Sequence, residues 1–241
     1  DFESLNLTEI IRLQNQLSAL LARRFEKTLA LAFSDVTGST AYFARFGNEA
    51  GRRLQQRHVD LIVKSLEGSS GRIVDTVGDG VFLCFPQVET AVEVLSGFQT
   101  LRLQENSHLP PEHHMTTRIG IHWGTVLTDR VIVTGDPVNL CAKFAATGQP
   151  TEIRITKPAF LELTVQRRLR CQPIGPVKVA GVQEPMEMFT FSWADPARFP
   201  STVVIVETGE QIPLPPHPIV TFGRLREMNG LQANDIVLTH K

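Results

Sequence analysis

Two aspartates, Asp35 and Asp79, each stand where an apolar, strand-like run meets a glycine turn. Two carboxylates that converge without a neighbouring cation are most stable when they share a metal ion. Because the ligands would be oxygen only, magnesium is the favoured ion. The pair therefore predicts a two-metal phosphate site. Either aspartate alone is typical of an ordinary turn, since Asp-Gly is a common hairpin turn.

The run that follows Asp35 is suited to binding an anion. A glycine-turned backbone ahead of a helix points several N–H groups and hydroxyls at phosphate oxygens. We expect this phosphate cradle to consist of Thr37, Gly38, Ser39 and Thr40.

The elements that must hold these residues can be read from hydrophobic periodicity and turn signals. Their order, βαββαβ, is the split βαβ arrangement, so we predict an α+β, ferredoxin-like domain whose antiparallel sheet carries helices on one face. The expected strands are 28–36, 72–77, 81–85 and 117–127, with a candidate strand at 130–134, and the expected helices are 48–66, 89–103 and 137–146. Later segments, at 152–155, 157–167 (helical) and 175–193, are expected to extend the sheet.

Composition excludes several classes of protein. The 241 residues are 42% apolar, which is enough for a real core. Twenty-four Lys and Arg against 25 Asp and Glu give a net charge of -1, so nucleic acid is not an expected partner. The apolar runs are far shorter than the roughly 20 residues of a membrane span. Three cysteines, an odd number without metal-ligand spacing, predict a reducing, cytoplasmic location.

The N-terminal segment, residues 1–27, reads as one amphipathic helix. Leu7, Ile10 and Leu17 recur at helical spacing, and Asn6 with Glu9 resembles a capping box. Two interpretations stay open: the apolar stripe packs on its own domain, or it pairs with a second helix as a dimerisation and transducer element. The chain starts at Asp1 rather than at methionine, and we expect it to be part of a longer protein.

Four motifs, taken in order and spacing, resemble the catalytic domain of class III nucleotide cyclases. The resemblance covers residues 28–193. Together the motifs are far more specific than any one of them. They are Phe33-Ser34-Asp35-Val36-Thr37-Gly38-Ser39-Thr40, Thr76-Val77-Gly78-Asp79-Gly80, Arg118-Ile119-Gly120-Ile121-His122-Trp123-Gly124 and Gly135-Asp136-Pro137-Val138-Asn139-Leu140-Cys141-Ala142.

The resemblance implies conversion of a nucleoside triphosphate into a 3′,5′-cyclic nucleotide and pyrophosphate. Asp35 and Asp79, helped by the Val36 carbonyl, would hold two Mg²⁺ or Mn²⁺ ions. Arg118 would contact the terminal phosphates, and Asn139 would position the ribose. The family places its site between two subunits, so the resemblance implies a homodimer.

The residues that would read the base depart from the pattern of adenylate cyclases. Asp75 stands where those enzymes have a lysine, and Ile132 stands where they have an aspartate or threonine. Guanine presents N–H donors that suit a carboxylate, and guanylate cyclases carry an acid at the first position. The resemblance therefore favours GTP over ATP, with a pyrimidine or a loosely read purine left open.

Two phosphate-facing positions also differ. The transition-state arginine of the family is Lys143 here, which keeps the charge and loses the planar fork. Ala180 replaces a lysine, and Lys178, two residues earlier on the same face of a strand, is a candidate substitute. Together with Asp75 and Ile132, these differences motivate a rival reading, in which a degenerate cyclase domain dimerises or binds a nucleotide without turnover and relays signals to a phosphothreonine-binding module.

Three histidines are not expected to act in the site. His122 is predicted to pack in the core, and His113 and His114 are predicted to lie in a solvated loop.

The C-terminal part reads as a linker, 194–200, followed by a strand-rich segment, 201–241. Phe222-Gly223-Arg224 followed by Asn234-Asp235-Ile236-Val237-Leu238 resembles the first half of a forkhead-associated domain. That resemblance implies a phosphothreonine protein as partner of the complete domain. Ordinary strands that extend the cyclase domain are the alternative.

Overall fold

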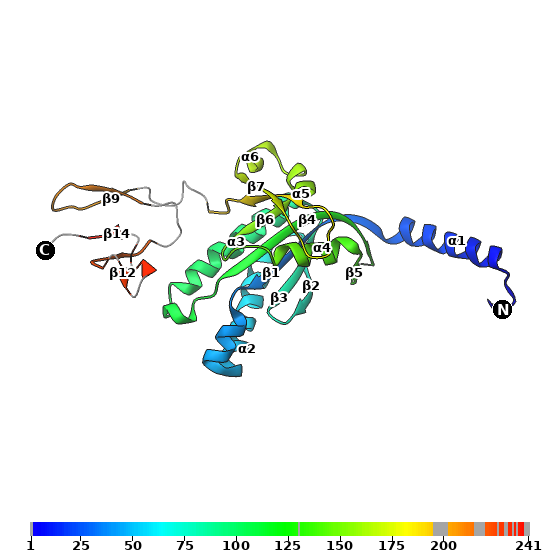
Figure 1. The fold of residues 1–241 in the computed structure, drawn as a ribbon, viewed down its shortest axis with the longest axis horizontal. Coiled ribbons are helices and arrows are strands. Elements are labelled where there is room, and N and C mark those ends of the chain that lie inside the picture. The colour runs from blue at the N-terminus through cyan, green and yellow to red at the C-terminus, as the bar shows by residue number, and fades with distance from the viewer. Residues whose placement is uncertain are drawn as a thin grey trace. The chain divides into compact units, whose positions relative to one another are not determined.

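The computed structural model (Figure 1) describes residues 2–129, 131–194, 202–214, 220–225, 227–228, 231–232, 234 and 236–238. The chain divides into two compact units, Asp1–Trp193 and Ala194–Lys241. No helix among these described residues is both long and apolar enough to cross a bilayer.

The first unit is built on a βαββαβ core, as predicted. Its four strands follow the order β2-β3-β1-β4, and every neighbouring pair is antiparallel. The α+β, antiparallel class expected from the sequence is therefore confirmed. The core elements are β1 (Glu26–Val36), α2 (Ser39–Leu66), β2 (Arg72–Val77), β3 (Gly80–Phe85), α3 (Val88–Asn106) and β4 (Thr117–Thr128).

Later segments lengthen the same sheet beyond β4. There the order continues β4-β6-β8-β7; β6 runs parallel to β4, and the two remaining pairs are antiparallel. A short strand, β5, pairs with the end of β4. The short η2 turn (Pro111–His113) precedes β4. The later elements are β5 (Val133–Thr134), α4 (Asp136–Ala145), β6 (Ile153–Thr156), α5 (Lys157–Leu161), α6 (Val165–Arg168), β7 (Cys171–Val177) and β8 (Met186–Phe191).

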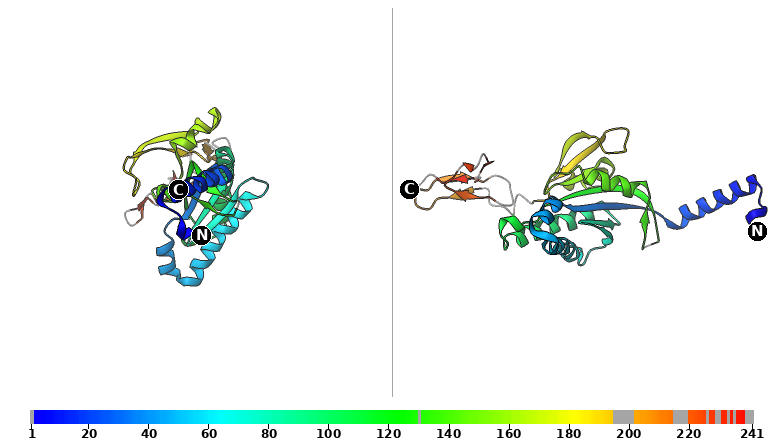
Figure 2. Two further views of the ribbon diagram at one scale, coloured as in Figure 1. Left: turned by 90° about the vertical axis from the view of Figure 1, so that its right-hand side faces the viewer. Right: turned by 60° about the horizontal axis from the view of Figure 1, so that its bottom comes forward.

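Both faces of the sheet are covered, which corrects the prediction of helices on one face. Side chains alternate along a strand, so β1 sends Ala30 and Ala32 to one side and Leu31 to the other. Ala30 and Ala32 belong to the core cluster that holds the buried residues of α3 and Ile62 of α2, whereas Leu31 packs in a second cluster with Phe144 of α4. Figure 2 gives two further views of this layering. The second cluster puts α4 over the strand ends that carry the candidate site.

The helices of the core agree with the predicted bounds in part. α2 is broken at Gly47, whose φ of 84° a helix cannot contain, so its second part begins after this glycine and ends at Leu66, as predicted for 48–66. A first helical part, from Ser39 to the kink, precedes the predicted bounds. The single helix expected over 157–167 is instead two short helices, α5 and α6. The chain leaves the helical conformation between them, where Leu163 is buried.

Helix α1 (Leu7–Phe25) follows a short η1 turn (Phe2–Ser4) and has the predicted capping box. The Asn6 side chain accepts from the Glu9 main-chain N–H, and the Glu9 carboxylate accepts from the Asn6 N–H. None of the helix residues is buried, and Leu7 and Leu17 are 73% and 52% exposed. A partner for the apolar stripe stays a prediction.

The second unit consists of short strand pairs. β9 (Thr202–Val204) and β10 (Gln211–Pro213) form an antiparallel hairpin, and β12 (Glu227–Met228) pairs with β13 (Leu231–Gln232). β11 (Phe222–Gly223) runs parallel to β14 (Ile236–Val237). Of the predicted linker, 194–200, all but Ala194 lies outside the described residues, as does Asp235 of the motif that resembles a forkhead-associated domain.

Candidate functional site

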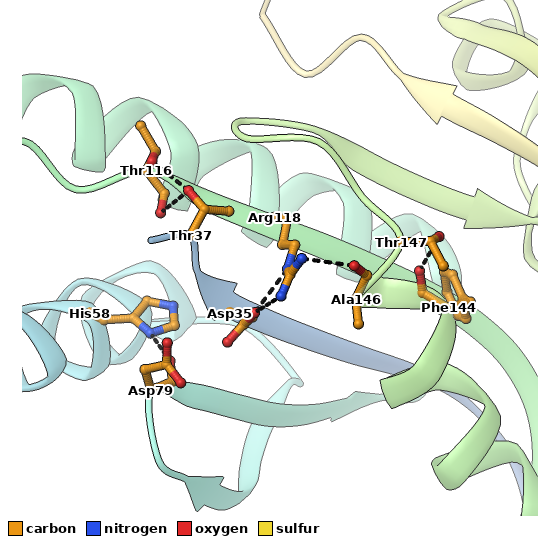
Figure 3. A network of polar contacts seen from close by, with 9 residues as sticks. All are labelled: Asp35, Thr37, His58, Asp79, Thr116, Arg118, Phe144, Ala146 and Thr147. Atoms are coloured by element: carbon orange, nitrogen blue, oxygen red, sulfur yellow. Dashed lines mark hydrogen bonds and ion pairs between the residues drawn. The ribbon is translucent and has the colours of Figure 1, made fainter. Parts of the chain in front are cut away.

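The two predicted acids meet at one corner of the sheet, together with Arg118 (Figure 3). Asp35 on β1 lies opposite Gly80 on β3 and opposite Arg118 on β4, and Asp79 occupies the β2–β3 turn. The Arg118 guanidinium donates to one oxygen of Asp35, with Nε–Oδ2 and Nη2–Oδ2 distances of 2.8 and 2.6 Å. We call Asp35, Asp79 and Arg118 the acidic corner.

The electrostatics of this corner favour an additional cation. Burial raises the pKa of Asp35, the Arg118 hydrogen bond lowers it, and repulsion from Asp79 raises it again. The net direction is upward, so one guanidinium does not fully compensate two neighbouring carboxylates in a half-buried position. A divalent cation would supply the missing positive charge.

Arg118 also contacts the end of helix α4. Its Nη1 donates to the main-chain oxygen of Ala146 at 2.8 Å, immediately after the last helical residue. Carbonyl groups at a helix C-terminus are unpaired and carry partial negative charge, so they attract a guanidinium. The predicted phosphate contact of Arg118 would thus start from a side chain already fixed between β1 and α4.

A cavity of about 260 Å³ opens beside Asp35. Phe33 and Phe82 line it, and their rings stack with centroids 4.6 Å apart and planes 9° apart. Helix α4 contributes only alanine side chains to the lining. The lining residues are Phe33, Ser34, Asp35, Val77, Gly80, Phe82, Ala142, Ala145 and Ala146.

The predicted phosphate cradle is partly committed to internal bonds. The Thr37 N–H donates to the Thr116 carbonyl at 2.8 Å, and the Thr37 hydroxyl contacts the Thr116 hydroxyl at 2.6 Å. Gly38 has a left-handed φ of 73°, and Ser39 and Thr40 begin α2. The first N–H groups of a helix lack partners within the helix. The start of α2 therefore stays available to an anion, whereas the Thr37 N–H is already paired.

The residues of this corner fit Mg²⁺ or Mn²⁺. Among the residues that the structure describes, no group of three or more His, Cys, Asp and Glu side chains could hold a metal. Two carboxylates with a nearby main-chain oxygen suit magnesium, which is usually held by one or two carboxylates, waters and substrate phosphates. Val36, the predicted carbonyl ligand, ends β1 just past the last pair of the β1–β3 ladder, Asp35 opposite Gly80.

A second group of predicted residues lies apart from the acidic corner. Asn139 and Lys143 are exposed on α4, one turn apart, and Lys143 Nζ lies 2.9 Å from where a Cβ on Gly181 would be. Lys178 and Ala180 are also exposed. Lys178 follows β7 directly and Ala180 forms a turn with Gly181, so the prediction that Lys178 and the Ala180 position share one face of a strand is wrong. Among the described residues, no hydrogen bond or ion pair joins Asn139, Lys143 or Lys178 to the acidic corner.

The two predicted base-reading residues are both exposed. Asp75 lies on β2 opposite Phe82, and its Oδ1 accepts from the Thr76 N–H at 2.8 Å. Ile132 precedes β5 and is 59% exposed, although it is apolar. We call Asp75, Ile132, Asn139, Lys143 and Lys178 the open group.

Sequence reasoning missed His58. This residue is 1% exposed, and its Nδ1 and Nε2 contact the Asp79 carbonyl oxygen at 3.0 Å and the Ser34 hydroxyl at 2.8 Å (Figure 3 shows the first contact). Burial lowers its pKa to about 4. A signal was present: His58 lies four residues after Leu54 and four before Ile62, on the buried stripe of α2.

The three histidines that were predicted to lie outside the site differ in burial. His122 is buried as predicted, with its Nδ1 2.9 Å from the Thr156 hydroxyl. The prediction of a solvated loop for His113 and His114 is correct only in part. His113 ends η2 and His114 follows it in irregular structure, but both are half-buried. His113 Nδ1 pairs with the Tyr42 hydroxyl, and His114 Nε2 pairs with the Leu109 carbonyl.

Comparison with known proteins places this geometry in context. The family model described as "Adenylate and Guanylate cyclase catalytic domain" matches residues 22–192. An adenylate cyclase of Streptomyces coelicolor is 26% identical over 151 residues, which cover 59% of this chain and 36% of that protein. The chain spans between 20% and 36% of the length of the curated relatives it matches.

Solved structures share the fold. An adenylate/guanylate cyclase/hydrolase from Silicibacter pomeroyi superimposes with a TM-score of 0.60 at 23% identity, covering 69% of this chain and 96% of that one. The guanylate cyclase domain of a Catenaria anguillulae protein, solved in complex with GTP, gives a TM-score of 0.58 at 18% identity, with 69% and 97% covered. At these identities the structures establish the architecture and not the substrate.

Proposed function

Because the chain belongs to the family of adenylate and guanylate cyclase catalytic domains, we propose that residues 28–193 convert a nucleoside triphosphate into a 3′,5′-cyclic nucleotide and pyrophosphate. The observation that carries this proposal is the acidic corner. Asp35 and Asp79 lie together with Arg118, although the sequence separates them widely. The neighbouring cavity gives a substrate access to the same carboxylate.

The carboxylates of Asp35 and Asp79 and the carbonyl of Val36 would hold two Mg²⁺ or Mn²⁺ ions. Bound there, the ions would lower the pKa of the ribose 3′-hydroxyl and neutralise the triphosphate. The raised pKa of Asp35 supports this role, since the carboxyl pair lacks compensating charge without them.

Arg118 and the start of α2 would bind the phosphates. Arg118 is a planar, permanently charged donor that binds phosphate oxygens in a bidentate manner. The N–H groups at Gly38, Ser39 and Thr40 would add donors at the positive end of the α2 dipole. Arg118 would then divide its donors between Asp35 and a phosphate.

The open group would serve the active site of a second protomer. Asn139 would position the ribose, and Lys143 and Lys178 would offset charge on the phosphates. Their exposure and their lack of bonds to the acidic corner support a site completed across a homodimer with two-fold symmetry.

We propose GTP as the preferred substrate over ATP. Asp75 is an exposed acid on the strand beside Phe82, and a carboxylate accepts from the N–H groups of guanine. Ile132 offers no polar contact, so discrimination would depend mainly on Asp75.

The direct test is product identity. The purified chain is incubated with Mg²⁺ or Mn²⁺ and each of the four ribonucleoside triphosphates, and products are identified by mass spectrometry. Cyclic GMP is expected in excess over cyclic AMP, and Asp79→Asn should remove both. If the wild-type protein forms no cyclic product from any triphosphate, the proposal is wrong.

A second candidate function is a domain that binds nucleotide or dimerises without turnover. Ile132 and Ala180 motivate it, since each replaces a polar side chain of the family with an apolar one, and Lys143 replaces an arginine. Nucleotide binding by the wild type without any cyclic product would favour this candidate.

For the second unit we propose the first part of a forkhead-associated domain, whose complete form binds a phosphothreonine protein. The parallel pairing of Phe222–Gly223 with Ile236–Val237 and the Asn234 Nδ2–Leu225 oxygen bond of 2.7 Å support a compact β unit. Phosphothreonine peptide binding by a longer chain would test it.

We also propose that the protein works in the cytoplasm. Cys84, Cys141 and Cys171 are free thiols, and the first two are buried, as expected in a reducing compartment. Fractionation of cells that express the full-length protein would test this location.

A further inference from the structure

His58 connects the two chain segments that carry the candidate metal ligands. It comes from α2, and its ring reaches Ser34, the residue before Asp35 on β1. The other side of the ring reaches the main chain of Asp79 itself. The ring also packs against Phe98, with centroids 5.6 Å apart, so its position is fixed by the core as well as by these two contacts.

The hydrogen bonds define the tautomer. A carbonyl oxygen only accepts, so Nδ1 must carry the proton that is donated to Asp79. In the neutral ring Nε2 is then an acceptor, and the Ser34 hydroxyl donates to it. The bonds run in one direction, from Ser34 through His58 to the Asp79 carbonyl.

The turn that carries Asp79 needs such support. Gly78 has a φ of 63°, and glycines flank Asp79 on both sides, so the local backbone is free to adopt many conformations. The ring is held on the opposite side by α2, whose Leu54 and Ile62 are 3% and 0% exposed. A rigid helix therefore fixes the carbonyl of an otherwise adaptable residue.

We propose that His58 is a positioning residue that sets the position of Asp79 relative to Asp35 by donating from Nδ1 to the main-chain oxygen of Asp79, while the Ser34 hydroxyl holds the ring in the tautomer that can donate. It acts through these residues and does not touch the metal or the substrate. This inference rests on the proposed function of the acidic corner. Outer-shell partners of this kind change metal affinity about 10–100-fold when they are removed.

Two substitutions separate the two ends of the ring. In His58→Asn the amide nitrogen lies two bonds from Cβ, as Nδ1 does, so the variant retains a donor for the Asp79 carbonyl. In His58→Gln the amide nitrogen lies three bonds from Cβ, as Nε2 does, so the donor faces Ser34 instead. His122→Gln is the matched control, because His122 is also buried and hydrogen-bonded through Nδ1, but to Thr156.

The experiment measures the dissociation constant of Mn²⁺ alone by electron paramagnetic resonance on the full chain, with melting temperatures recorded in parallel. We expect His58→Gln to weaken Mn²⁺ binding about tenfold, and His58→Asn and His122→Gln to stay close to wild type. Equal weakening in both His58 variants, or unchanged affinity in a folded His58→Gln, would overturn the inference.

Two further results keep the outcomes distinct. If His58→Gln does not fold, His58→Phe decides, because it keeps a ring and has no donor for the Asp79 carbonyl. Weaker Mn²⁺ binding than in His58→Asn is expected, and equal affinity would contradict the inference. If wild-type protein forms cyclic nucleotide while the His58 variants bind Mn²⁺ normally, this inference fails and the proposed function stands. Absence of Mn²⁺ binding and of cyclic product in the wild type overturns both.

Discussion

The acidic corner and the open group carry similar numbers of polar residues and differ in how they are held. In the corner, Arg118 bonds to Asp35 and to the end of α4, and Asp79 is held through His58. In the open group, Asn139 and Lys143 are exposed, and no described bond links them to the corner. The corner is preorganised within one chain, whereas the open group is exposed. The proposed site, divided between two protomers, would account for the difference.

The largest expected effect comes from removing a carboxylate of the corner. Asp79→Asn should lower kcat at least about a hundredfold, since metal-dependent charge stabilisation is worth several kcal/mol and each 1.4 kcal/mol is a factor of ten. Turnover is measured by chromatography of the cyclic product. Glu67→Gln, an exposed acid outside both groups, is the control. Near-normal turnover in folded Asp79→Asn would show that the corner is not the reaction centre.

The base-reading half of the open group can be tested by reversing its chemistry. Asp75→Lys combined with Ile132→Asp should shift the ratio of kcat/KM for GTP and ATP toward ATP by about tenfold or more, because a well-placed polar contact is worth about 1–3 kcal/mol. Rates with both nucleotides are compared side by side. A ratio that does not change would remove both residues from base recognition.

A smaller gain is expected from Lys143→Arg. Arginine restores a planar, bidentate donor on the same helix face, so kcat should rise by up to about tenfold while KM changes little. Steady-state kinetics at saturating metal separates the two constants. A fall in kcat would mean that the lysine is adapted to this site as it is.

The corner should also carry a small cost in stability that the open group lacks. A carboxyl whose pKa is raised on folding loses stability as the pH rises above its unfolded value of 3.8. Asp35→Asn should therefore melt at a slightly higher temperature than wild type at neutral pH without metal, and the difference should shrink toward pH 3.8. Asn139→Ala, an exposed change in the open group, should leave the melting temperature nearly unchanged. A lower melting temperature for Asp35→Asn would mean that its ion pair with Arg118 outweighs burial.

The acids were predictable from the sequence, because glycine turns at strand ends mark Asp35 and Asp79 locally. The βαββαβ order was also predictable, because the hydrophobic periodicity of each segment indicates whether it is a helix or a strand. The Asp35–Arg118 pair was not, because it depends on the register that places these residues opposite each other on β1 and β4. His58 was hidden for a related reason: its helix position is readable, but its contact with the β2–β3 turn requires the packing of α2 against the sheet.

Mixing two inactive variants tests the divided site most directly. Asp79→Asn removes one carboxylate of the acidic corner, and the double variant Asn139→Ala with Lys143→Ala removes two polar side chains of the open group. Unfolded together and refolded at equal amounts, they should recover about one quarter of wild-type turnover, because half of the dimers then contain one intact site out of two. Each variant refolded alone should stay inactive. No recovery in a mixture whose heterodimers are verified by mass spectrometry, alongside active wild type, would contradict the account.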